Sequence, residues 1–251
     1  MGLLYPEDAH FDASARQTGF NRYRQLLSER FGQLWRANLL TLPGFVPLAL
    51  GVFYAVASSS VLVLLPCSIL GGMVAGPFLA GMYDTILRGL RDDPRPWWDG
   101  YKHAWEQNWK SSLLPGALLG LVLGVYTFMA MLFWWADRAP SIGTIAVYLF
   151  ALLVVLIVNT LYWPQLVLFR QKVSIRLENC LLFCIKYFSR VLFAGALQLG
   201  YWAIFVLFAP WTLLLLPILG VWYILFLSQF LIYPQMDEAF KIEERCIEIH
   251  G

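Results

Sequence analysis

Long stretches without charged residues constrain this chain more than any other feature of its sequence. Residues 37–83 and 191–236 contain no Asp, Glu, Lys or Arg, and residues 111–169 contain only Asp137 and Arg138, near the middle. A helix that crosses the hydrocarbon layer of a membrane needs about 20 mostly apolar residues. Each stretch therefore has room for two membrane-spanning helices and a tight turn between them.

The fold class that this pattern predicts is an all-α, polytopic membrane protein with six transmembrane helices arranged as three hairpins. The helices are expected at roughly 39–57, 61–83, 113–135, 145–168, 191–209 and 213–233. Barrel strands do not fit, because they would be about ten residues long and alternate in polarity. We expect a cytoplasmic N-terminal segment with an interfacial helix (1–36), a transmembrane domain (37–236) and a cytoplasmic tail (237–251).

Composition and charge support this prediction. Only 14% of the residues are charged, against about 25% in soluble domains, so the lipid bilayer is the expected partner. The net charge of +2 gives no indication of nucleic-acid binding. Of the 18 Lys and Arg residues, all but Arg138 lie outside the predicted hairpin turns. Because cationic loops stay in the cytoplasm, we expect a cell-membrane protein with both termini cytoplasmic.

The segment RDDPRPWWDGYKHAWEQNWK (91–110) predicts a separate amphipathic helix at the cytoplasmic membrane surface. Pro94 and Pro96 should prevent the second span from continuing into it. At the helical repeat its rings share one face, with lysines beside them that can reach lipid phosphates. The interfacial residues are Trp98, Tyr101, Trp105, Trp109, Lys102 and Lys110. The segments around 23–36 and 175–190 are expected to form similar surface helices.

A metal or proton site at Asp99, His103 and Glu106 is the alternative for this segment. One helix supplies at most three mixed ligands, and no second His or Cys cluster completes a coordination shell. The cysteines, at 67, 180, 184 and 246, have no metal-ligand spacing. We therefore expect free thiols, no metal and no cofactor.

Polar side chains within or near the predicted spans are the candidates for a ligand pocket, since such groups are costly in lipid. One hypothesis is a polar and aromatic pocket open to the cytosol. Its members would be Asn38, Asp84, Asn159, Gln165, Gln198, Gln229, Tyr83, Tyr162 and Tyr233. The alternative, which we favour, is that the amides hold helices together. Asp84 and Arg88 are spaced for an ion pair, and Gly72 and Gly76 for close helix contact.

A family resemblance rests on GPFLAGMYDTILRGLRDD (from Gly76), WWDGYKHAWEQNWKSSLLPG (to Gly116) and the later LYWPQLVLFRQKVSIRLENCLLFCIKYFSRVLF. These segments resemble the YesL-like family of bacterial integral membrane proteins, over roughly residues 30–235. The family is a domain of unknown function, and its members often occur beside carbohydrate-uptake genes. The resemblance implies no catalytic residues.

No enzyme motif is present: the chain has no Walker loop, nucleophile elbow or HExxH sequence. We therefore expect a non-enzyme, and favour an accessory or scaffold component of a bacterial membrane assembly linked to carbohydrate uptake. Its partners would be ABC transporter subunits or further copies of itself. The alternative is a small secondary transporter or permease that uses the pocket described above.

Overall fold

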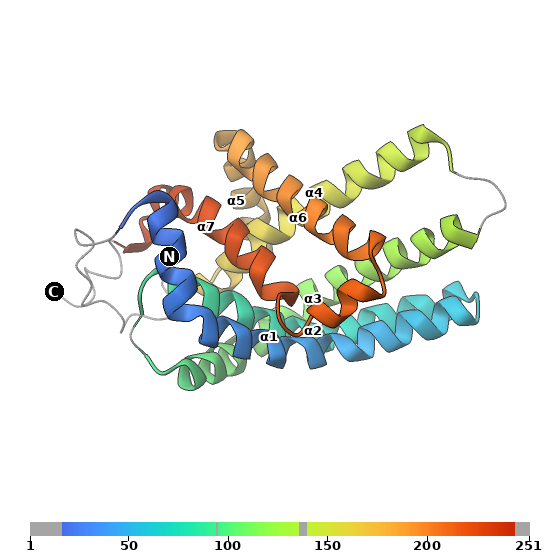
Figure 1. The fold of residues 1–251 in the computed structure, drawn as a ribbon, viewed down its shortest axis with the longest axis horizontal. Coiled ribbons are helices and arrows are strands. Elements are labelled where there is room, and N and C mark those ends of the chain that lie inside the picture. The colour runs from blue at the N-terminus through green and yellow to red at the C-terminus, as the bar shows by residue number, and fades with distance from the viewer. Residues whose placement is uncertain (1–16, 94, 136–139, 244–251) are drawn as a thin grey trace.

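The structure is a computed structural model that describes residues 17–93, 95–135 and 140–243 (Figure 1). Over these residues the chain is helical and contains no strand, as the sequence predicts. The elements are α1 (Gly19–Ala57), α2 (Val61–Leu90), α3 (Trp97–Trp135), α4 (Ile142–Leu168), α5 (Val173–Lys186), α6 (Phe188–Leu207), the 3-10 helix η2 (Trp211–Leu215) and α7 (Gly220–Phe240).

Helices α1, α2 and α3 lie side by side along the long axis of the molecule (Figure 1). Helix α4 diverges from α3 at the end where these two helices are joined, and α6 crosses obliquely. Five helices, α1, α2, α3, α4 and α6, are long and apolar enough to cross a membrane. The described part of the chain thus has the helices of a multi-pass membrane protein.

The close packing of α2 on α3 depends on small residues at matching heights. A Cβ atom built at Gly72 would lie 2.3 Å from the carbonyl oxygen of Gly116, and one built at Gly120 would lie 2.4 Å from that of Ser68. A Cβ at Gly76 would lie 2.4 Å from the carbonyl oxygen of Ser112. The predicted close contact at Gly72 and Gly76 is confirmed, and its partner is the glycine series of α3.

Two of the predicted surface helices are not separate elements. Residues 97–110 form the first turns of the 39-residue helix α3, and the N-terminal surface segment continues into α1 from Gly19. The residues at the two junctions, 36–39 and 110–113, include neither Pro nor Gly. The helices continue even through Pro43, Pro47 and Pro115, although each of these prolines removes one backbone hydrogen bond. Pro96 does separate α2 from α3, whereas Pro94 lies outside the described residues. Only α5, which an extended segment separates from α4, is a short helix of its own.

The last predicted helix, 213–233, is placed differently in the structure. Residues 211–215 are a 3-10 helix, and α7 begins only at Gly220 and continues to Phe240. Pro217 falls in the intervening turn, where its missing N–H group costs no helical hydrogen bond. Helix α7 is not among the candidate spans, and most of its first seventeen residues are buried or half-buried against α1, α2, α4 and α6.

Candidate functional site

A cluster of buried charges at the C-terminal end of α2 is the most polar region inside the protein. Arg88 Nε lies 2.8 Å from Asp84 Oδ2, which confirms the predicted ion pair. Asp84 is fully buried and Arg88 is 5% exposed. The guanidinium of Arg88 occupies the space where Gly100 has no side chain, since a Cβ there would lie 1.5 Å from Arg88 Nη1. Glycine at the start of α3 is therefore required for this ion pair to fit.

The turn between α2 and α3 adds further ion pairs to the cluster. Arg95 Nη2 lies 2.9 Å from Asp93 Oδ2, and Asp93 Oδ1 also accepts a hydrogen bond from the Arg95 backbone N–H. Arg22 of α1 pairs with Asp92, whose left-handed backbone (φ 60°) ends α2. Burial disfavours the charged form of Asp93, but Arg95 and Arg88 outweigh this effect and hold the pKa of Asp93 below its usual value. These contacts fix the α2–α3 turn against the start of α1.

The sequence reading missed most of this cluster. It identified the Asp84–Arg88 pair from the spacing of four residues, but not the contribution of Arg22, Asp92 and Asp93. The run RDDPR (91–95) was a usable signal, because residues of opposite charge beside a proline are well suited to a turn held by ion pairs. Arg22 could not be found this way, because it lies 70 residues from Asp92 in the sequence.

A second polar site connects α4, α6 and α7 around Thr160. The side-chain amide of Gln198 donates a hydrogen bond to Thr160 Oγ1, and that of Gln229 donates one to the Thr160 carbonyl oxygen at 2.9 Å. All three residues are buried. Gln198 and Gln229 are thus brought together as predicted members of a shared site, and each amide bonds to another helix.

Asn38 of α1 binds the turn that precedes α7. Its Nδ2 atom donates hydrogen bonds to the carbonyl oxygens of Leu216 and Pro217 at 3.0 and 3.3 Å. Its Oδ1 atom accepts one from the Val221 backbone N–H at 3.0 Å. Asn38 is fully buried, and a Cβ at Gly220 would lie 2.5 Å from its Oδ1 atom. The side chain therefore caps α7 from a different helix.

The other polar candidates on α4 make local or neighbouring contacts. Asn159 accepts a hydrogen bond from Trp163 Nε1 at 2.9 Å, and the ring of Trp163 stacks on Tyr83 with centroids 6.1 Å apart. Gln165 contacts Cys180 of α5. Burial raises the pKa of the Cys180 thiol to about 12.

The two remaining tyrosines of the predicted pocket contact charged groups. The ring of Tyr162 lies 5.8 Å from the guanidinium carbon of Arg176. The Tyr233 hydroxyl donates a hydrogen bond to Glu243 at 3.3 Å. Among the amides, Asn38, Gln165, Gln198 and Gln229 bond to another part of the helical bundle, as the favoured alternative predicts, whereas the bonds of Asn159 lie within α4. Whether any of the nine predicted pocket residues binds a ligand stays a prediction.

The aromatic stripe of residues 97–110 is divided between α2 and the surface. Tyr101 is buried against Gly81, and its hydroxyl lies 3.4 Å from the Phe78 carbonyl oxygen. Trp105 packs edge-on against Phe78. Tyr101 is therefore covered by α2 and not by lipid headgroups, because the start of α3 packs on α2. Trp105 is half-buried, and its interfacial position stays a prediction. Trp98, Trp109, Lys102 and Lys110 are exposed, as an interfacial role requires.

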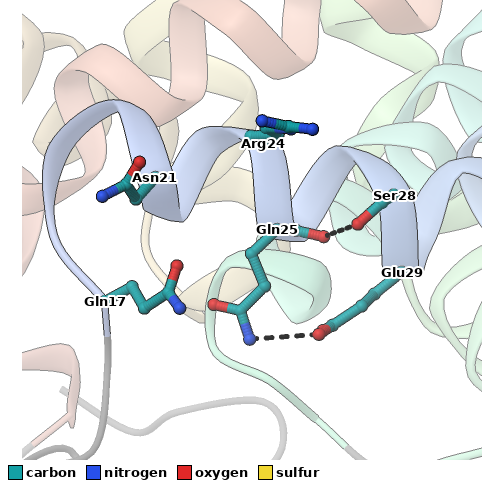
Figure 2. A pocket seen from close by; sticks show the side chains of 6 residues that line it. All are labelled: Gln17, Asn21, Arg24, Gln25, Ser28 and Glu29. Atoms are coloured by element: carbon teal, nitrogen blue, oxygen red, sulfur yellow. Dashed lines mark hydrogen bonds between the residues drawn. The ribbon is translucent and has the colours of Figure 1, made fainter.

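No metal centre emerges among the described side chains. Over residues 17–93, 95–135 and 140–243, no group of three or more His, Cys, Asp and Glu side chains could hold a metal ion. Figure 2 shows a shallow hollow on the first turns of α1, which contains none of the predicted pocket residues. It is lined by Gln17, Asn21, Arg24, Gln25, Ser28 and Glu29.

Comparison with family models, with curated proteins and with solved structures finds no match for this chain. The polar sites described above therefore carry the functional argument. Their charges and amides mostly bond to one another and to the backbone of neighbouring helices.

Proposed function

We propose that this chain is a non-catalytic accessory or scaffold component of a bacterial membrane assembly. The observation that supports the proposal is how the buried polar groups are used. Asn38 bonds to the turn before α7 and to its first residues, and Gln198 and Gln229 both bond to Thr160 of α4. The buried Arg88 is engaged by Asp84 and Asp93. Such contacts rigidify a helical body, and leave few of these groups to bind a substrate.

In this proposal α1–α2 and α3–α4 are two spanning hairpins in the cell membrane, with both termini in the cytoplasm. The charged cluster would then lie at the cytoplasmic ends of the spans, where burial against protein replaces water as the partner of each charge. The link to carbohydrate uptake, and ABC transporter subunits as partners, depend on the resemblance to the YesL-like family. Self-association is the other form of assembly that fits a scaffold.

Copurification with defined partners tests the scaffold role. The tagged chain is extracted in a mild detergent, and an ABC permease and its ATPase are sought by mass spectrometry in stoichiometric amounts. The matched control is Trp109→Ala, which removes an exposed ring of α3 without touching the ion pairs. We expect the wild-type chain to retain the partner or to elute as an oligomer. A monodisperse monomer without these partners would contradict the proposal.

A secondary transporter is the second candidate, and one observation favours it. The side-chain oxygens of Ser228 and Gln229 on α7 are buried and have no hydrogen-bond partner among the described residues. Unsatisfied buried acceptors are what a polar substrate such as a sugar would bind. Uptake of a labelled sugar by proteoliposomes that contain only this chain would support transport, and loss of uptake in Gln229→Leu would assign it to this site.

A further inference from the structure

The turn between α6 and α7 stops part-way along the molecule. In Figure 1 the ends of α1 and α2, and of α3 and α4, lie at the far end of the long axis, whereas η2 and the start of α7 lie well short of it. Yet residues 191–236 are as free of charge as residues 37–83 of α1, α2 and the turn between them. An apolar hairpin of that length would be expected to reach the same level as the others.

The contacts of Asn38 set the depth of this turn. Asn38 binds the carbonyl oxygen of Leu216, and nineteen residues of α1 separate it from Ala57. At the rise of an α-helix this is about 28 Å. Trp211 begins η2 five residues before Leu216. At the rise of a 3-10 helix, η2 extends at most about 10 Å beyond Asn38. Trp211 therefore lies about 18 Å short of the end of α1.

The side chains beyond the turn require hydrocarbon around them. Phe53 on α1, Leu62 on α2 and Phe150 on α4 are 72%, 85% and 67% exposed. Because the hydrocarbon layer is about 30 Å thick, a layer that covers these residues extends to about the level of Asn38. The turn then lies inside this layer. Moving the layer to put the turn at its outer surface would leave about 18 Å of apolar helix in water.

The surface of the turn itself also fits hydrocarbon. Trp211 and Leu214 are 76% and 71% exposed, and Leu213 and Ile218 are exposed beside them. None of residues 208–219 is charged. A turn of this composition in water would expose an apolar patch without polar neighbours, which soluble surfaces rarely do.

The backbone of the turn is bonded within the protein, as a position in lipid demands. The carbonyl oxygens of Leu216 and Pro217 accept from Asn38, and that of Gly220 accepts from the Tyr201 hydroxyl at 2.8 Å. Thr212 Oγ1 donates to the carbonyl oxygen of Phe205, and Trp222 Nε1 donates to that of Ile218. Four backbone N–H groups of the turn donate to backbone carbonyl oxygens, in the pairs Thr212 to Phe208, Leu213 to Pro210, Leu216 to Leu213 and Leu219 to Leu215.

We propose that α6, η2 and α7 form a re-entrant hairpin. It enters the membrane from the side of the chain termini, turns within the hydrocarbon, and leaves on the same side. The partner of the exposed surface of Trp211, Leu213, Leu214 and Ile218 is the acyl chains of the bilayer. The chain then crosses the membrane four times. This inference rests on the membrane location, and not on the scaffold role.

Cysteine accessibility tests the inference. Single cysteines are placed in a cysteine-free background at Leu214 (L214C), at Ser59 in the α1–α2 turn (S59C) and at Lys172 before α5 (K172C). Each variant is treated with a membrane-impermeant maleimide on intact cells and on inverted vesicles. We expect S59C to label on intact cells, K172C on inverted vesicles, and L214C on neither. Size-exclusion chromatography in detergent checks that each variant is folded.

Fluorescence quenching measures directly whether residue 214 lies in the hydrocarbon, so that the proposal does not depend on an absence of labelling. L214C is labelled with bimane after purification, reconstituted in phosphatidylcholine vesicles, and quenched by lipids with a spin label at a shallow or a deep chain position. We expect stronger quenching by the deep label, with S59C showing the reverse. Labelling of L214C from outside would show a full crossing, and labelling from inverted vesicles would place the turn in the cytosol. Either overturns the proposal.

Failure of the membrane location gives a different pattern. If S59C and K172C both react on intact cells, or both on inverted vesicles, the two positions lie on the same side of the membrane. The predicted membrane crossing between them would then be wrong. The scaffold role is judged by its partners alone, so its failure leaves the labelling pattern unchanged.

Discussion

Replacing Gly72 by alanine should separate α2 from α3. The added Cβ would lie 2.3 Å from the carbonyl oxygen of Gly116 and 2.7 Å from Cα of Gly120, whereas ordinary contact begins at 3.4 Å. Both atoms belong to backbone, which cannot rotate away. The helices must therefore move apart locally by about 1 Å. A gap of that size forfeits a quarter to a half of each dispersion contact, so we expect a loss of about 1–3 kcal/mol.

Thermal unfolding in detergent measures this loss. For a chain of this length, 1 kcal/mol corresponds to roughly 2–4 °C, so G72A should lower the Tm by roughly 2–12 °C. The matched control is G200A on α6, because nothing lies within 4 Å of a Cβ at Gly200. Alanine there should be neutral or slightly stabilising. The double variant G72A/G120A should cost less than the two single losses together, since the first separation makes room for the second methyl group.

The reasoning fails if G72A and G200A have the same Tm. That result would mean that α2 and α3 do not approach as closely as the glycines indicate. Strictly additive losses in the double variant would also count against it, because they would assign the cost to each helix alone.

The remaining predictions concern the polar sites. Asn38→Ala should lower stability by about 2 kcal/mol, seen as a lower Tm in detergent, because the Leu216 and Pro217 carbonyl oxygens lose their donor; an unchanged Tm would refute the cap. The pKa of Asp93 is lower in the folded than in the unfolded chain. Its contribution to stability is therefore complete above the unfolded pKa and is lost as the pH falls through the folded pKa. Asp93→Asn should make the Tm fall less steeply towards acid pH, and an unchanged fall would contradict this. Cys180 should react with a maleimide at pH 8 far more slowly than in the SDS-unfolded chain, because burial raises the pKa of its thiol to about 12; equal rates would show that α5 does not cover it.

The YesL-like resemblance is a prediction that a homologue alignment can test. If the resemblance holds, the glycines at 72, 76, 100 and 116 should stay small, because each is closely approached by neighbouring atoms. Substitution by larger residues at these positions in related sequences would separate this chain from that family.

The helical class, the first four apolar helices and the helix ends at residues 57, 61, 135 and 168 could be predicted from the sequence. These follow from local causes, since charge-free length sets where a chain can enter lipid and Pro96 separates α2 from α3. The spacing of Asp84 and Arg88, and of Gly72 and Gly76, also gave real contacts, because each pair lies one turn apart on a single helix.

Which surfaces those helices cover depends on contacts between distant segments, and so could not be predicted from local patterns. Residues 97–110 have the pattern of a surface helix, yet Tyr101 packs on α2, since a ring is equally at home against protein and at a lipid interface. Residues 191–236 have a charge pattern that fits a spanning hairpin and a re-entrant hairpin equally well, because both return the chain to the same side of the membrane. Its actual depth depends on Asn38, which is 178 residues away from the carbonyl group that it binds. Hydropathy measures preference for lipid at each position, whereas depth is set by contacts between distant segments.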